Sequence, residues 1–185
     1  MPLSEVLATK LLATRRGRRD DRSRAVEASA AAHSLTELNF PLACRTLAKD
    51  ALRLCGAESA GMTVFDMDDS DELIWISVAG TLHDFERRRF PRHHSPCGVS
   101  FDTRAIQLFI EPHRYFEWMR VAGITINEAL VCPLFNASGN LYGTIWVMSH
   151  RDIGIHFEQL DARILMQLAT AAAEVVRVKT MRALR

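Results

Sequence analysis

Residues 128–149 read EALVCPLFNASGNLYGTIWVMS, two strand-forming runs separated by a short turn-forming stretch. Glu128 to Phe135 and Leu141 to Ser149 are rich in the apolar, β-branched and aromatic residues that favour strands. The Asn, Ser and Gly residues between them are typical of hairpin turns. This stretch predicts a β-hairpin, and with it antiparallel strand pairing.

A second hairpin is predicted upstream. Ser59 to Met67 and Glu72 to Ala79 have strand-like composition and are separated by the acidic turn at 68–71. Ala105 to Ile110 is a further short strand. Between the second hairpin and this strand, residues 80–104 show no clean period and contain two prolines and a glycine after position 90, which predicts a long irregular crossover.

Helices are predicted at both ends of this pattern. Apolar residues recur at helical steps from about Pro41 to Cys55, where Gly56 ends the helix. A longer stripe runs from Phe157 to about Leu184 through Leu160, Ile164, Leu165, Leu168, Ala172, Val175 and Val178. A helix that overhangs a domain of this size needs a partner for its far half, and a second copy of the chain is the simplest one.

Three shorter helices complete the pattern. They cover residues 4–14, residues 25–32 and a segment that opens at Pro112 and closes at Gly123, in which Tyr115, Phe116 and Met119 share one face. The order of elements predicts an α+β fold, with helices on one face of an antiparallel sheet and loops on the other. We divide the chain into an N-terminal helical and basic extension, 1–33, and a domain that includes the later N-terminal helix and the C-terminal helix, 34–185.

Composition limits the partners of the chain. Its 185 residues are 48% hydrophobic and 24% charged with a formal net charge of +1, so no overall attraction to nucleic acid or an anionic membrane is expected. The arginine-rich segment 15–24 has no interleaved aromatic residue, so we interpret it as a solvated helix or linker and not as a nucleic-acid patch. The sequence predicts a cytoplasmic protein, because its cysteines are irregularly spaced, an acidic residue lies where a signal peptide would be basic, and no apolar run reaches 18 residues.

Three motifs carry a resemblance to a known family. LVCPL at 130–134, GTIWVMSH at 143–150 and FEQLD at 157–161 resemble a GAF domain, a sensory module, and the resemblance covers about residues 41–176. SPCG at 95–98 and EPHRYF at 111–116 are similar to a subgroup of GAF domains that is fused to bacterial sensor kinases. The resemblance implies a PAS-related, six-stranded antiparallel sheet whose N- and C-terminal helices pack on one face and dimerise, with a ligand pocket beneath the crossover on the other face.

The same resemblance implies a function. A small molecule binds in the pocket, and its occupancy biases the helical dimer interface. Because the chain ends at Arg185 without an output segment, we expect either that the output comes from a separate protein such as a histidine kinase or that the chain is a lone sensor. No catalytic residues, metal ligands or cofactor are specified. The predicted ligand-binding residues are the aromatic, polar and thiol side chains placed around such a pocket: Trp75, Phe90, His94, Cys97, Phe101, Phe109, Arg114, Tyr115, Trp118, Glu128, Trp146 and His150.

Two alternatives stay open. His93, His94 and Cys97 form an H-H-x-x-C pattern, which could support a metal, haem or thiol redox function, or an activity like that of the GAF-type free methionine sulfoxide reductases. In the simpler interpretation of these residues, which we favour, Ser95 caps a short helix and Cys97 packs in the core. The remaining alternative is a structural dimerisation module with a filled pocket.

Overall fold

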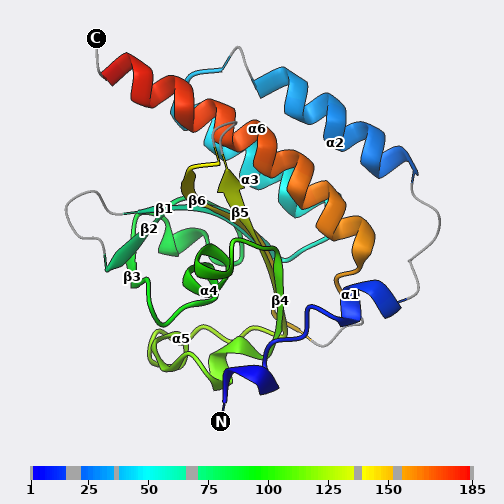
Figure 1. The fold of residues 1–185 in the computed structure, drawn as a ribbon, viewed down its shortest axis with the longest axis vertical. Coiled ribbons are helices and arrows are strands. Elements are labelled where there is room, and N and C mark those ends of the chain that lie inside the picture. The colour runs from blue at the N-terminus through cyan, green and yellow to red at the C-terminus, as the bar shows by residue number, and fades with distance from the viewer. Residues whose placement is uncertain are drawn as a thin grey trace.

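Six strands form a single antiparallel sheet in the computed structural model, in the order β3-β2-β1-β6-β5-β4 (Figure 1). The structure describes residues 2–15, 22–35, 38–65, 71–135, 139–151 and 156–183. The strands are β1 (Ser59–Phe65), β2 (Glu72–Gly80), β3 (Arg89–Pro91), β4 (Gln107–Ile110), β5 (Glu128–Phe135) and β6 (Leu141–Ser149). The predicted α+β class with a six-stranded antiparallel sheet is confirmed, and so are both hairpins. The predicted turn at 136–140 and the acidic turn at 68–71 lie mostly outside the described residues.

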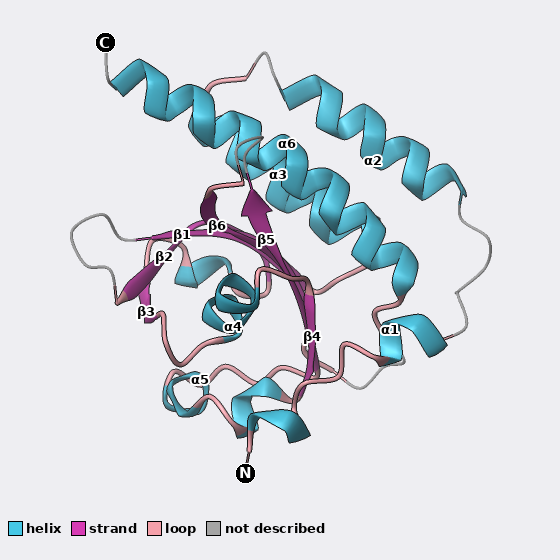
Figure 2. Cartoon of the chain, viewed as in Figure 1, coloured by secondary structure: helices cyan, strands magenta, loops and turns pink. Residues whose placement is uncertain are grey.

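Three helices lie on one side of the sheet, two of them packed on its strands and one packed on these two helices (Figure 2). They are α2 (Arg22–Ser34), α3 (Phe40–Leu54) and α6 (Gln159–Ala183). Asn39 caps the start of α3, and its side chain accepts a hydrogen bond from the Leu42 N–H at 3.1 Å. Leu47, Leu54, Ile164, Leu165 and Leu168 of α3 and α6 pack on Leu130, Ile145 and Val147 of the sheet. The N- and C-terminal helices therefore share one layer, as predicted; the side chains of Val175 and Val178 lie outside the described part of the structure.

The crossover between β2 and β5 covers the opposite face. Its elements are η3 (His83–Phe85), β3, α4 (Pro96–Thr103), β4, η4 (Pro112–Arg114) and α5 (Glu117–Val121). β3 and α4 lie in the stretch that shows no clean period in the sequence. The single helix predicted after Pro112 is wrong: the chain makes a 3₁₀ turn, and Phe116, fully buried against Phe109, changes the chain direction before α5.

The N-terminal segment lies along the outer edge of β4. The helix predicted over residues 4–14 is wrong, because the chain forms η1 (Leu3–Glu5), then an isolated bridge between Leu7 and Phe109, then α1 (Leu11–Thr14). The Ala8 N–H donates to the Leu108 carbonyl at 2.8 Å, and the Ile110 N–H donates to the Val6 carbonyl at 2.8 Å. The extended conformation is favoured over a helix because it pairs with backbone groups at the edge of β4 that a short helix would leave without partners.

Thr9 anchors the pairing of the N-terminal segment with β4. Its hydroxyl donates to Gln107 Oε1 at 2.6 Å and accepts the Leu108 N–H at 3.0 Å. Replacing Thr9 with valine leaves both partners unsatisfied, and we expect a loss of about 1–3 kcal/mol in the free energy of unfolding by urea. Thr14→Val, at an exposed hydroxyl that bonds only the Leu11 carbonyl, is the matched control and should change little. Equal losses in the two variants would contradict an anchoring role.

Two arginines of the segment 15–24 bind buried carboxylates. Arg15 pairs with Glu128 of β5, and Arg24 pairs with Asp161 in the first turn of α6. Arg24 Nε also donates to the Leu54 carbonyl at the end of α3 at 2.6 Å. The prediction of a solvated segment is therefore wrong for these two residues, while residues 16–21 lie outside the described part. Within the described residues, no helix is long and apolar enough to cross a membrane.

Candidate functional site

Four aromatic rings fill the space between the sheet and the crossover. Trp75 of β2 and Trp146 of β6 lie on the sheet, with ring centroids 4.6 Å apart. Phe90 of β3 lies 4.3 Å from Trp75, and Trp118 of α5 lies 4.6 Å from Phe90. Trp75 and Trp146 are buried, whereas Trp118 is half-buried. The structure thus brings together four of the predicted ligand-binding residues in what we call the aromatic chamber.

Local sequence explains how the floor of the chamber is built. Trp146 faces Gly61 across the β1–β6 pair, and a Cβ atom at Gly61 would lie 2.4 Å from the Trp146 ring. Glycine is required at this position for the indole to lie across β1. The Trp146 Nε1–H then donates to Thr63 Oγ1 at 3.0 Å, which satisfies the only polar group of the buried indole.

Almost no free volume remains inside the chamber. A cavity of about 10 Å³ is left, the space of one water molecule at most. The residues around it are all uncharged: Leu73, Trp75, Phe90, Ser95, Pro96, Cys97, Trp118, Met119 and Met148. A bound molecule of any size would therefore have to displace a side chain, and its charge would find no counter-ion there.

Cys97 is buried at the edge of the chamber. Ser95 caps α4 by accepting the Gly98 N–H at 3.0 Å, and the Cys97 side chain packs inward, 3.6 Å from Thr63 Oγ1. Burial raises the pKa of the Cys97 thiol above its ordinary value, and the hydroxyls of Thr144 and Thr63 offset this only in part. Burial at this position therefore favours the neutral thiol over the thiolate.

The two histidines of the H-H-x-x-C pattern lie on the surface. His93 contacts Asp71, with 3.0 Å between Nε2 and Oδ1. His94 is exposed, and its ring lies 5.1 Å from Tyr115 and 5.3 Å from Phe116. The structure therefore does not gather these histidines and Cys97 around one point. No group of three or more His, Cys, Asp or Glu side chains suited to a metal occurs within the described residues.

Other predicted site residues lie beside the chamber or at its rim. Phe109 packs on Phe116 with centroids 5.9 Å apart, in the same apolar cluster as the chamber, and Tyr115 packs against that cluster. Phe101 lies at the rim, in edge-to-face contact with Phe65 at 4.1 Å. Arg114 is exposed and pairs with Glu111 at 2.9 Å, so its guanidinium belongs to the surface.

Glu128 and His150 are held in structural networks instead. Glu128 lies on the helix face, where it accepts bonds from both Arg15 Nη atoms and from the Phe157 N–H. His150 Nδ1 lies 2.8 Å from the Thr125 carbonyl, so Nδ1 carries the proton of the neutral ring, and Nε2 accepts from Ser59 Oγ at 2.7 Å. Neither side chain is brought together with the chamber residues.

The sequence predictions omitted several chamber residues. Thr63, Thr144, Leu73 and Met148 lie on the same sheet face as Trp75 and Trp146. Alternation along each strand could have identified Thr144 and Met148, which are two residues from Trp146 on either side. Met119 was assigned to the apolar face of a helix but not to the site. An extra residue in β2, Ile76, lies opposite the step from Met62 to Thr63 of β1 and breaks the same inference for the first hairpin.

Comparison with solved structures identifies the fold. A GAF domain of a phosphoenolpyruvate-protein phosphotransferase from Coxiella burnetii is 13% identical, with a TM-score of 0.73 over 89% of this chain and 99% of that one. The GAF-B domain of DevS from Mycobacterium smegmatis is 22% identical, with a TM-score of 0.60 over 76% and 94%. Free methionine-R-sulfoxide reductase from Neisseria meningitidis, in complex with its substrate, is 16% identical, with a TM-score of 0.69 over 91% and 97%.

These structures confirm that the chain has the GAF-domain fold. No protein-family model matches the sequence, and no curated protein sequence does. At these identities the likeness establishes the architecture alone. The neighbours include both a reductase and domains of signalling proteins, so the function has to be argued from the chamber.

Proposed function

We propose that this chain is a cytoplasmic sensory module that binds a small, uncharged, planar molecule in the aromatic chamber and has no catalytic activity of its own. The aromatic chamber, enclosed beneath the crossover, is the observation that carries this proposal. Ring faces of Trp75, Phe90 and Trp146 are suited to stacking on a flat ligand. The Cys97 thiol, which lines the remaining cavity, supplies a polar group that would orient it.

Trp118 is the side chain that a ligand would replace. It is half-buried, it comes from the five-residue helix α5, and its Nε1–H donates to the His94 carbonyl at 2.8 Å. Moving the Trp118 side chain outward breaks one hydrogen bond to the crossover and no strand pairing. An aromatic ligand would then occupy the space of the indole, whose ring centroid lies 4.6 Å from that of Phe90 and 6.3 Å from that of Trp75.

Occupancy would reach the terminal helices through the sheet. In β6, Trp146 and Met148 face the chamber while Ile145 and Val147 pack in the helix-side core with α6. A ligand that shifts β6 favours one arrangement of α6, provided its affinity for the two arrangements differs. We propose that α6 and α2 form a homodimer interface and that a separate output protein, such as a bacterial histidine kinase, detects its arrangement.

A cavity variant tests whether the chamber accepts a ligand. Trp118→Ala should lower the free energy of unfolding by no more than about 3 kcal/mol, because the ring is only half-buried. Indole should then raise the melting temperature of Trp118→Ala by binding the vacated space. Arg114→Ala, at an exposed residue of the same crossover, is the control, and indole should leave its melting temperature unchanged.

For the unaltered chain, the measurement is a thermal-shift panel of aromatic heterocycles, nucleotides, other metabolites and haem. A saturable shift with a neutral planar compound, together with a change in tryptophan fluorescence, supports the proposal. If indole fails to stabilise Trp118→Ala and no compound shifts the unaltered chain, the sensory proposal fails.

The second candidate function is a structural dimerisation module whose chamber is filled by its own side chains, and one observation favours it. Only about 10 Å³ is free in the chamber, so the rings already pack as a core. In that case the chain dimerises without a ligand. The thermal-shift panel on the unaltered chain separates the two candidates, since a permanently packed core would show no saturable shift with any compound.

A further inference from the structure

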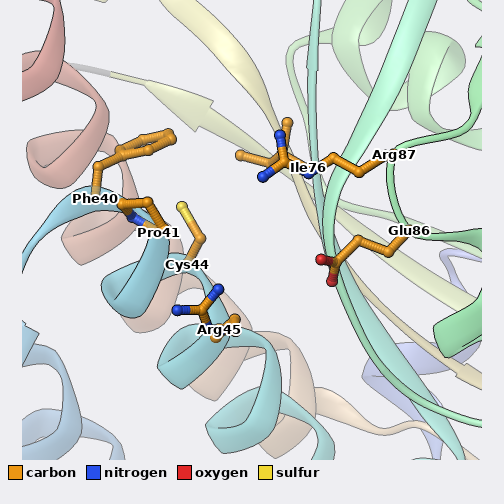
Figure 3. A pocket seen from close by; sticks show the side chains of 7 residues that line it. All are labelled: Phe40, Pro41, Cys44, Arg45, Ile76, Glu86 and Arg87. Atoms are coloured by element: carbon orange, nitrogen blue, oxygen red, sulfur yellow. The ribbon is translucent and has the colours of Figure 1, made fainter.

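A groove runs between α3 and β2 on the helix side of the sheet, away from the aromatic chamber. One cavity of about 290 Å³ is lined by Phe40, Pro41, Cys44, Arg45, Ile76, Glu86 and Arg87 (Figure 3). An adjoining cavity of about 350 Å³ shares Arg45 and Glu86 and is lined further by Lys49, Leu52, Ser77, Val78, Ala79, Gly80 and His83. We call the two together the α3–β2 groove, and each has a volume typical of small-molecule sites.

Cationic side chains converge on this groove from two distant segments. Arg45 and Lys49 are four residues apart on α3, so they project from the same helix face and repel each other. Arg87 comes from the turn before β3, and Figure 3 shows it reaching past Ile76 toward α3. Like charges gathered around one cavity raise the affinity of that cavity for an anion.

These cations differ from most other arginines whose side chains the structure describes in having no carboxylate partner. Arg53, Arg89 and Arg92 each form an ion pair with an acidic side chain. Within the described ranges, no ion pair is formed by the three cations of the α3–β2 groove. The acidic residue of the groove is Glu86, and one of its oxygens already accepts the Val78 N–H at 2.9 Å. The lining therefore keeps an excess of positive charge.

The remaining walls are apolar. Phe40 and Pro41 open α3, Ile76 lies across from them on β2, and the Cys44 side chain lies between. We propose that the α3–β2 groove binds a small organic anion, a carboxylate or a phosphate ester. Arg45 and Arg87 hold its charged group by charge-assisted hydrogen bonds, and its apolar body lies against Phe40 and Ile76.

Titration of the full chain with simple probe compounds tests this site. Amide chemical shifts and calorimetry measure the binding. Phenyl phosphate and benzoate represent the two anionic groups, inorganic phosphate lacks the apolar body, and phenol lacks the charge. We expect saturable binding of phenyl phosphate or benzoate, with shifts at Arg45, Ile76 and Arg87. Whichever anion binds more tightly identifies the class. Inorganic phosphate and phenol should each bind at least about tenfold more weakly, a difference of about 1.4 kcal/mol.

Charge variants sharpen the test. Arg45→Gln and Arg87→Gln should each weaken binding by about tenfold or more while leaving the melting temperature unchanged, since both side chains are exposed and unpaired. Glu86→Gln can still accept the Val78 N–H and removes a repelling charge, so it should tighten binding. Arg120→Gln, which removes an exposed arginine of α5 paired with Glu117, is the matched control and should not change the affinity.

Several results would overturn the proposal. One is that neither organic anion binds saturably, and another is that inorganic phosphate binds as tightly as the organic anions. The others are a loss of affinity in Arg120→Gln equal to that in the groove variants, or weaker binding by Glu86→Gln than by the unaltered chain. The proposal is independent of the aromatic chamber, because Trp118→Ala should leave binding in the α3–β2 groove unchanged.

Discussion

Gly143→Ala is expected to destabilise the chain severely, although it adds only one methyl group. A Cβ atom at position 143 would lie 1.9 Å from the Thr63 carbonyl oxygen of the neighbouring strand β1. The β6 backbone fixes the position of the Cβ atom and the oxygen belongs to the β1 backbone, so neither can move without separating the strands. We expect a loss of at least about 4 kcal/mol, measured by urea unfolding where the variant folds and by loss of cooperative unfolding where it does not.

Gly123→Ala is the matched control for this variant. Gly123 has a φ of 73°, and a Cβ there would meet no atom within 4 Å. Its substitution should cost only the left-handed backbone penalty of about 1–2 kcal/mol. A comparable loss in the two variants would show that close packing of β1 on β6 is not what requires glycine at position 143.

Glu128→Ala should produce the second large loss of stability. The Glu128 carboxylate is almost fully buried and binds Arg15 through both oxygens, at 2.7 and 2.8 Å, as well as the Phe157 N–H at 2.9 Å. Removing it leaves the Arg15 guanidinium, 18% exposed, without its anion, and it leaves a buried N–H unpaired. We expect a loss of about 3–5 kcal/mol in the free energy of unfolding. Hydrogen exchange should increase at Ala8 and Ile110, because the N-terminal segment loses its anchor.

Two variants control for this effect. Glu128→Gln keeps one acceptor and should lose less than Glu128→Ala. Glu111→Ala breaks the exposed pair with Arg114 and should cost no more than about 1 kcal/mol. If Glu128→Ala were as mild as Glu111→Ala, Arg15 would not hold the N-terminal segment.

Periodicity predicted the parts of the fold that have a continuous apolar face. Both hairpins, α3 and α6 match their predicted ranges to within about two residues, because each buries one face along its whole length. The crossover has no such face. Its elements are only three to eight residues long, and their positions are fixed by single contacts, such as Phe116 on Phe109, that no periodic pattern reveals.

The site could be predicted only in part for a related reason. Aromatic residues such as Trp75 and Trp146 were recognisable because large rings next to strands line either a core or a pocket. Glu128 looked like an orienting group at a strand start, but its partners Arg15 and Phe157 lie more than 25 residues away along the chain. A carboxylate can be assigned to a pocket or to an ion pair only once such long-range partners are known.

The position of β1 in the sheet has a consequence for synthesis of the protein. β1 pairs with β2, the next strand along the chain, but also with β6, which is the last strand to be made. A ribosome releases residues 59–80 long before residues 141–149, so the first hairpin has to wait with one side of β1 open. Completion of the domain is therefore expected to follow translation of almost the whole chain, at a rate limited by these distant pairings.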